Sequence, residues 1–293
     1  MTISLLQGVL GACQALVLPA LAFGLHMPPE ERGPVDAQQL VSIAERTLDF
    51  PATGEFLAAG GHPVAAPVRS ATTPAFHIMK RQVSLAEYAQ CVDAGACAAA
   101  DAPTADTDVP VTGVSWIDAN AYARWYSSTT GETWRLPTAL EAAAAAAERF
   151  RGEAFPAVAD DPANPAVLWI RRYQEDAAAR RPVDRTPRPG GHYGVNTLGI
   201  EDFGGNVWEW TATCYSRAVL DAGGEIDSVI ENCGVRVLEG RHRAYMSHFV
   251  RDGRSGGCAV GTPPANLGFR LVLDEQRCGP RCWIARFSRQ VRA

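Results

Sequence analysis

The sequence predicts a single α+β domain in which helices and short strands are joined by much irregular chain. Three capping boxes indicate helices, and short apolar runs separated by glycine and proline indicate strands. With 293 residues, 47% of them hydrophobic and 20% charged, the chain can bury a core and is neither disordered nor fibrous. The sequence contains no internal repeat and no low-complexity linker that would divide it into two domains.

The amino-terminal segment resembles an export signal. No residue before Glu30 is charged, and residues 1–25 are mostly apolar and contain the small-x-small pattern Ala20-Leu21-Ala22. We expect a signal peptide at 1–22 and hence a periplasmic or otherwise exported protein. The alternatives are a lipoprotein signal at Cys13, a buried core helix and an uncleaved membrane anchor, which would be the chain's one contact with a membrane.

The next part of the chain is expected to form a leader at 23–49 and then short strands. Leu40, Ile43 and Leu48 have helical spacing, which predicts a short helix over 35–48. From residue 50 to 75, glycine and proline interrupt short apolar runs, as strands and turns require.

Three helices are predicted from their first residues. Each begins with a serine or threonine followed three residues later by an acidic residue: Ser84 with Glu87, Ser115 with Asp118, and Thr138 with Glu141. The third opens an alanine-rich run that is expected to pack closely against a neighbour. A long Pro- and Arg-rich connection over 156–194 follows, and then short β-type runs up to residue 273.

Eight cysteines indicate an oxidising compartment, because a core of this size needs no disulfides for stability. Their spacing suggests three pairs, although sequence does not determine connectivity. Removal of the signal peptide would take away Cys13 and leave Cys258 as the candidate free thiol. The suggested pairs are Cys91 with Cys97, Cys214 with Cys233, and Cys278 with Cys282.

Composition and short motifs exclude several functions. The net charge of −5 argues against a nucleic-acid partner. The sequence has no Gly-x-Ser-x-Gly, no phosphate-binding loop, no HExxH and no GxGxxG. Its six histidines are scattered and show no metal-ligand spacing.

Six segments, taken together and in order, resemble the formylglycine-generating enzyme (sulfatase-modifying factor) family. The resemblance implies one irregular, C-type-lectin-like α+β domain at 50–275 with little regular secondary structure, followed by an Arg-rich tail at 276–293. The segments are GEFL (54–57), FHIM with VSLAEY (76–79 and 83–88), PVTGVSW (110–116), RLPT (135–138), GIEDFGGNVWEW (199–210) and NLGFR (266–270).

The resemblance also implies a structural calcium ion. In the family a calcium lies at the segment that corresponds to 199–210, and calcium prefers six to eight hard oxygen ligands. The matching ligands here would be the Asp202 and Glu209 carboxylates and the Gly205 and Val207 carbonyls.

The sequence departs from the family at the catalytic cysteines. Family activity depends on two cysteines that bind copper and activate oxygen, and these positions are Ser247 and Asp252 here. A serine hydroxyl does not replace a soft thiolate ligand of copper(I), so copper or iron chemistry is not expected. The catalytic residues, if any, are unknown from sequence.

Three functions remain open at this stage. Exported members of the family include pyoverdine-maturation proteins and proteins encoded beside copper nitrite reductase genes. The latter end in a sequence like residues 249–270 here. This resemblance implies an accessory or maturation role with a periplasmic protein partner, for example in denitrification. A metal-dependent oxidase of the same fold, acting on a peptide or secondary metabolite, is the second reading, with His248 and Asp252 as metal ligands. A glycan- or peptide-binding module is the third. Candidate groove residues are Trp208, Tyr245, His248 and Arg254.

Overall fold

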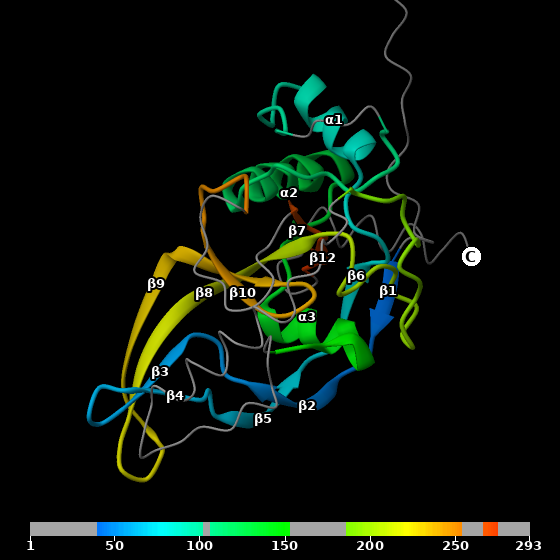
Figure 1. Ribbon diagram of the computed structural model, residues 1–293. Helices are drawn as coiled ribbons and strands as arrows, with labels where there is room; N and C mark the ends of the chain where they lie inside the picture. The colour runs from blue at the N-terminus through cyan, green and yellow to red at the C-terminus, as the bar shows by residue number, and fades with distance from the viewer. Residues whose placement is uncertain (1–39, 102–105, 153–185, 254–265, 275–293) are drawn as a thin grey trace, which may run out of the picture. The chain divides into compact units, whose positions relative to one another are not determined.

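A computed structural model describes residues 40–101, 106–152, 186–253 and 266–274 (Figure 1). All of them belong to one compact unit, Pro34–Ala293. The predicted signal peptide, Arg254, Cys258, the proposed Cys278–Cys282 pair and the tail lie outside the described residues. No helix in the described ranges is long and apolar enough to span a membrane.

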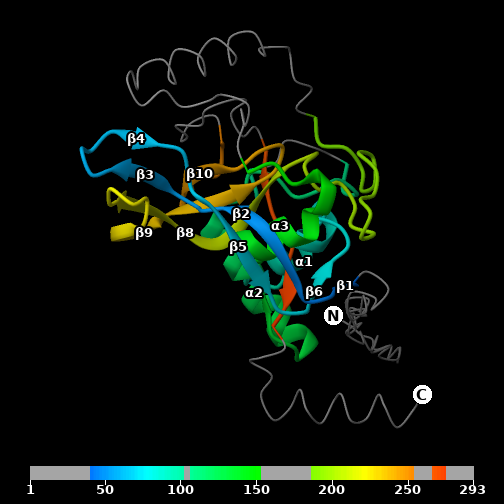
Figure 2. The ribbon, with the colours of Figure 1, turned by 90° about the horizontal axis from the view of Figure 1, so that it is seen from below.

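The predicted fold class is confirmed, because one unit combines helices, which lie in the middle of the described chain, with strands that come mainly before and after them (Figures 1 and 2). The described elements are β1 (Leu40–Ile43), β2 (Arg46–Pro51), β3 (Glu55–Ala58), β4 (Pro63–Val64), β5 (Val68–Thr73), β6 (Phe76–Met79), α1 (Leu85–Asp93), α2 (Trp116–Thr130), β7 (Trp134–Arg135), α3 (Ala139–Ala146), the 3₁₀ turn η2 (Ala147–Arg149), β8 (Trp208–Leu220), β9 (Ile226–Glu239), β10 (Ala244–Ser247), β11 (Leu267–Gly268) and β12 (Val272–Leu273).

The strands form three sheets. The largest has the order β10-β9-β8-β3-β4, with β11 also pairing with β8; β3 and β11 run parallel to β8. A second sheet has the order β1-β6-β12-β7, and β2 pairs with β5 as a separate two-stranded ribbon. The hairpin of β8 and β9 is the longest feature of the sheets (Figure 1). The expectation of only short β-type runs after residue 199 is therefore corrected.

The three predicted helices are confirmed, and each begins directly after its predicted cap. In every case the cap hydroxyl accepts a hydrogen bond from the backbone N–H of the acidic residue three positions later. The side chain of that acidic residue accepts one from the cap's own N–H. These reciprocal bonds satisfy donors that have no partner within the helix. The alanine-rich α3 contacts both the β2–β5 ribbon and the β8–β9 hairpin (Figure 2). Its alanines are buried.

The predicted helix over 35–48 is wrong for its described part. Residues 40–48 instead enter two strands, β1 and β2, which pair with β6 and β5. The buried Ile43 and half-buried Leu48 contact the core from strands, so an apolar spacing that fits a helix is satisfied by two extended segments. Because β1 pairs with β6 and so joins the second sheet, the domain begins earlier than the predicted residue 50.

Two of the suggested disulfides are confirmed: Cys91–Cys97 and Cys214–Cys233. The first closes the end of α1 and is buried in the main core. The second joins β8 to β9 across the long hairpin.

Candidate functional site

Ser247 and Asp252, which the sequence resemblance assigns to the family's catalytic cysteine positions, lie at and just beyond the end of β10. Ser247 is the last residue of that strand and pairs with Val235 of β9. Asp252 follows in the loop, and both residues are half-buried. Neither residue offers a thiolate. Any chemistry at this place therefore depends on the residues around them.

Beside Ser247, β9 bulges away from β8. The β9 partner of Tyr215 is Asn232, whereas the partner of the preceding residue, Cys214, is Arg236. The residues between Asn232 and Arg236 are therefore extra on the β9 side, and one of them is Cys233. Bulges of this kind redirect side chains and are frequent beside functional sites.

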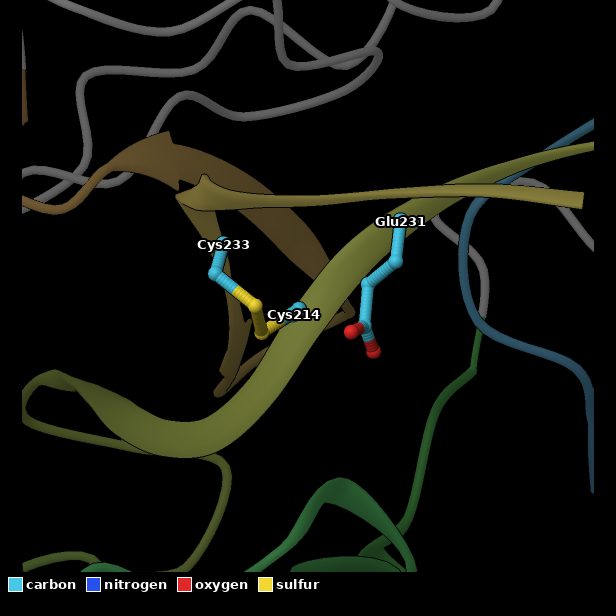
Figure 3. Close-up of side chains that lie close together, drawn as sticks. All are labelled: Cys214, Glu231 and Cys233. Carbon is cyan, nitrogen blue, oxygen red and sulfur yellow. A yellow bond between two sulfur atoms is a disulfide. The ribbon is translucent and has the colours of Figure 1, made fainter.

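The Cys214–Cys233 disulfide spans this bulge, and Glu231 lies beside it (Figure 3). The ligand atoms of Cys214, Glu231 and Cys233 all lie within 4.8 Å of one another. Because the two sulfurs are bonded to each other, they are not available to a metal in this state. Cys214 is half-buried, whereas Glu231 and Cys233 are exposed.

Arg236 brings a positive charge to the disulfide. Its Nη1 donates to the Ala212 carbonyl at 2.7 Å and lies 3.0 Å from Cys214 Sγ. Its guanidinium carbon lies 3.9 Å from the centre of the Trp116 ring, a cation–π geometry. Burial lowers the pKa of Arg236, and the Glu231 carboxylate acts against that shift.

His248 holds the bulge from the other side. Its Nδ1 lies 2.8 Å from the Gly234 carbonyl, and its backbone N–H donates to the same oxygen at 2.9 Å. Since a carbonyl only accepts, Nδ1 is the donor in this contact. The His248 ring also meets the Trp116 ring edge-on, with centroids 6.4 Å apart.

The loop after β10 is tied to the start of α2. Arg251 makes two hydrogen bonds to Asp118, from Nη2 at 2.7 Å and from Nε at 2.8 Å. Asp118 is also the acidic partner of the α2 capping box, so one carboxylate orders both segments. This bidentate pair fixes the loop that carries Asp252.

The oxidase reading would require a third ligand beside His248 and Asp252. In the described part of the chain, the one group of three or more candidate metal ligands is Cys214, Glu231 and Cys233, which includes neither residue. A site with two protein ligands is weak support for a bound transition metal.

The groove candidates are not all brought together. Trp208 is buried, with its Nε1 donating to the His242 carbonyl at 3.2 Å, so its predicted role in a surface groove is corrected. Tyr245 is half-buried, and its hydroxyl accepts from the Gly54 N–H at 2.8 Å. Arg254 lies outside the described residues. The neighbouring motif residue Trp210 is fully buried in the core.

The predicted calcium ligands lie together but do not fit a calcium ion as arranged. The two carboxylate oxygens of Asp202 accept backbone N–H groups of Gly191 and Tyr193, each at 2.7 Å. Both oxygens of Glu209 accept N–H groups of the Arg270 guanidinium, and the Glu209 Oε1 also accepts from Gln82. Calcium binds through six to eight oxygens, and the guanidinium and amide donors already on these carboxylates compete with the ion for them.

The comparisons with known proteins agree with the motifs. The chain matches the family model of the sulfatase-modifying factor enzyme 1-like domain over residues 29–275. It belongs to the sulfatase-modifying factor family. It is 34% identical over 181 residues to the mouse inactive C-alpha-formylglycine-generating enzyme 2, covering 58% of this chain and 51% of the mouse protein. Identity to the formylglycine-generating enzyme of Streptomyces coelicolor is 29% over 181 residues, covering 56% and 52%.

The chain thus spans about half the length of these curated relatives. Among solved structures it is similar to PvdO from Pseudomonas aeruginosa, with 19% identity, a TM-score of 0.49 and coverage of 80% of this chain and 94% of that one. The CarF structure is similar at 20% identity and a TM-score of 0.43, with 80% and 97% covered.

Sequence reasoning missed Arg236 and Glu231 as neighbours of the disulfide. Glu231 and Cys233 are two residues apart, which places them on one face of a regular strand, and this alternation was a usable signal. Arg236 had no such signal, because the bulge that aligns it with Cys214 is not visible in sequence.

Proposed function

We propose that this member of the sulfatase-modifying factor family is an exported accessory or maturation protein that does not perform the family's copper-dependent oxidation. The proposal is supported by the motif resemblance, which places Ser247 and Asp252 at the positions of the two family cysteines; in the structure they lie on β10 and in the next loop. The partner is proposed to be a periplasmic respiratory enzyme, and a copper nitrite reductase is the candidate to test first.

The cysteines that are present do not restore a copper site in the described residues. All four described cysteines are in disulfides, so none provides a thiolate. Copper(I) selects soft thiolate and thioether ligands, and a hydroxyl with a carboxylate does not substitute for them. Two disulfides also support export, since such bonds persist in oxidising compartments.

A candidate partner surface lies on the outer part of β9. Ile226, Val229 and Ile230 are exposed by 43%, 59% and 71%. Among the described strands, β10 pairs with β9 only from Val235 to Leu238, so this outer part faces no strand on that side. Exposed apolar side chains along an uncovered strand edge are typical of protein–protein contacts.

Co-expression tests the accessory role. A periplasmic copper nitrite reductase would be produced with and without this protein, and its copper content and nitrite-reducing activity would be measured. We expect both to rise in the presence of this protein. The double variant Val229→Thr with Ile230→Thr keeps β-branched residues but removes apolar surface, and we expect it to lose the effect.

The matched control is Val68→Thr, which changes an equally exposed valine on β5. If all three versions leave copper content and activity at the level seen without this protein, the maturation role for nitrite reductase is wrong. If Val68→Thr loses the effect as fully as the double variant, the β9 surface is not the contact.

A further inference from the structure

The disulfide beside the family's active-site position has features of a reactive rather than an inert bond. Cys233 is exposed in the β9 bulge, and Cys214 is half-buried with a guanidinium N–H 3.0 Å from its sulfur. The other described disulfide differs, because Cys91 and Cys97 are only 0% and 9% exposed and sit in the main core.

We propose that Cys214–Cys233 is a thiol–disulfide exchange site that accepts electrons from dithiols such as reduced cysteine pairs of peptides or proteins. An incoming thiolate attacks the exposed Cys233 sulfur. The S–S bond breaks, and Cys214 leaves as a thiolate that Arg236 stabilises. This activity goes beyond the accessory function and does not depend on it.

The first attack forms a mixed disulfide between the partner and Cys233. The second thiolate of the partner then attacks the partner's own sulfur in that mixed disulfide and releases Cys233 as a thiolate. The partner dithiol is oxidised to a disulfide by loss of two electrons, and Cys214 and Cys233 are reduced and take up two protons.

Arg236 is positioned to favour attack at Cys233 with Cys214 as the leaving thiolate. Its guanidinium is held in place by the Ala212 carbonyl and by the Trp116 ring, so it does not have to reorganise when charge develops on Cys214. Its Nε is buried and has no hydrogen-bond partner in the described part of the molecule, which leaves donor capacity for an anion. A cation beside a cysteine lowers the thiol pKa, and a leaving thiol of lower pKa departs faster.

Glu231 opposes the attack, because its carboxylate lies beside both sulfurs and repels an incoming thiolate (Figure 3). The two charged neighbours therefore predict opposite effects when they are neutralised. Arg236→Gln should slow reduction of the disulfide, and Glu231→Gln should accelerate it.

The test is the rate at which glutathione at pH 7.5 opens each disulfide, followed by acid quenching, alkylation and mass spectrometry. We expect Cys214–Cys233 to open at least about tenfold faster than Cys91–Cys97, with glutathione attached to Cys233. Arg236→Gln should slow opening on the order of fivefold. Arg124→Gln, which changes an exposed arginine of α2, should leave the rate unchanged.

Glu231→Gln keeps the proposal testable if Arg236→Gln does not fold, since Glu231 is exposed and its replacement should raise the rate. Equal opening rates of the two disulfides, glutathione attached to Cys214, or a Glu231→Gln rate at or below that of the parent chain would each overturn the proposal.

Discussion

Arg270 and Glu209 form a fully buried ion pair that joins two of the chain's most distinctive motifs. Arg270 Nη2 lies 2.7 Å from Glu209 Oε1, and its Nε donates to Oε2. The same guanidinium donates to the backbone carbonyls of Lys80 and Glu201, each at 3.1 Å. The GNVWEW segment is thereby fixed to the closing NLGFR segment, and both are fixed to the end of β6.

Breaking this pair should be costly. Arg270→Met removes the guanidinium and leaves the Glu209 carboxylate buried without a counter-ion, which should cost about 3–5 kcal/mol of the free energy of unfolding. Denaturant unfolding measures the loss. The double variant Arg270→Met with Glu209→Met should recover part of it, because no isolated charge remains. If the double variant loses more free energy of unfolding than the two single variants combined, the unpaired buried charge is not the reason for the loss.

Calcium should not stabilise the protein if the Arg270–Glu209 pair occupies the predicted calcium position. We expect the midpoint of thermal unfolding to differ by less than about 2 °C between calcium and EDTA. Isothermal titration of calcium provides the independent measurement. A saturable calcium binding that disappears in Glu209→Gln would instead restore the predicted ligand set.

Stability should fall as pH rises through the range set by Glu239. Burial raises the pKa of Glu239 to about 7, and Arg243, whose Nε lies 2.8 Å from Oε1, counteracts this only in part. Between the ordinary carboxyl pKa near 4.5 and about 7, the folded protein holds a proton that the unfolded chain has released. The stability that this bound proton contributes is therefore fully present below pH 4.5 and is lost as the pH rises to about 7.

The measurement is the free energy of unfolding at several pH values. One such proton gives a slope of at most about 1.4 kcal/mol per pH unit. Glu239→Gln should flatten the slope in this window whatever it does to absolute stability, and the exposed Glu45→Gln should not. An unchanged slope in Glu239→Gln would assign the titration to another group.

Trp208 should matter for folding and not for a surface groove. It is 4% exposed, and the backbone of Gly240 packs so closely that a Cβ there would lie 2.7 Å from its ring. Trp208→Ala should lower the free energy of unfolding by about 3–5 kcal/mol. The half-buried Trp125→Ala should cost less. A folded Trp208→Ala variant of nearly normal stability would contradict this placement.

The parts of the fold that sequence predicts are those set by neighbouring residues. Each capping box, such as Ser84 with Glu87, lies within one helical turn and can be recognised without knowledge of the fold. The two disulfide pairings can also be predicted from sequence spacing. Cys91 and Cys97 are close in the chain, and a glycine turn separates Cys214 from Cys233.

The parts that sequence does not predict depend on distant partners. Strand β1 was mistaken for helix because its pairing with β6 crosses a long stretch of chain. Arg270 and Glu209 are 61 residues apart, so their competition with calcium was not visible in the motif. The same holds for Arg236 and Trp116, which meet only when β9 and α2 are placed.

We propose that this domain does not carry out the family's copper chemistry, and a direct assay for formylglycine can show whether it does. The purified protein, with the Streptomyces coelicolor formylglycine-generating enzyme as positive control, would be incubated with copper(I), oxygen and a cysteine-containing sulfatase-type peptide, and formylglycine measured by mass spectrometry. If Ser247 and Asp252 stand at the family's cysteine positions, as proposed, formylglycine should come from the control alone. Formylglycine formed by this protein in repeated turnovers, with copper bound one to one, would contradict the claim.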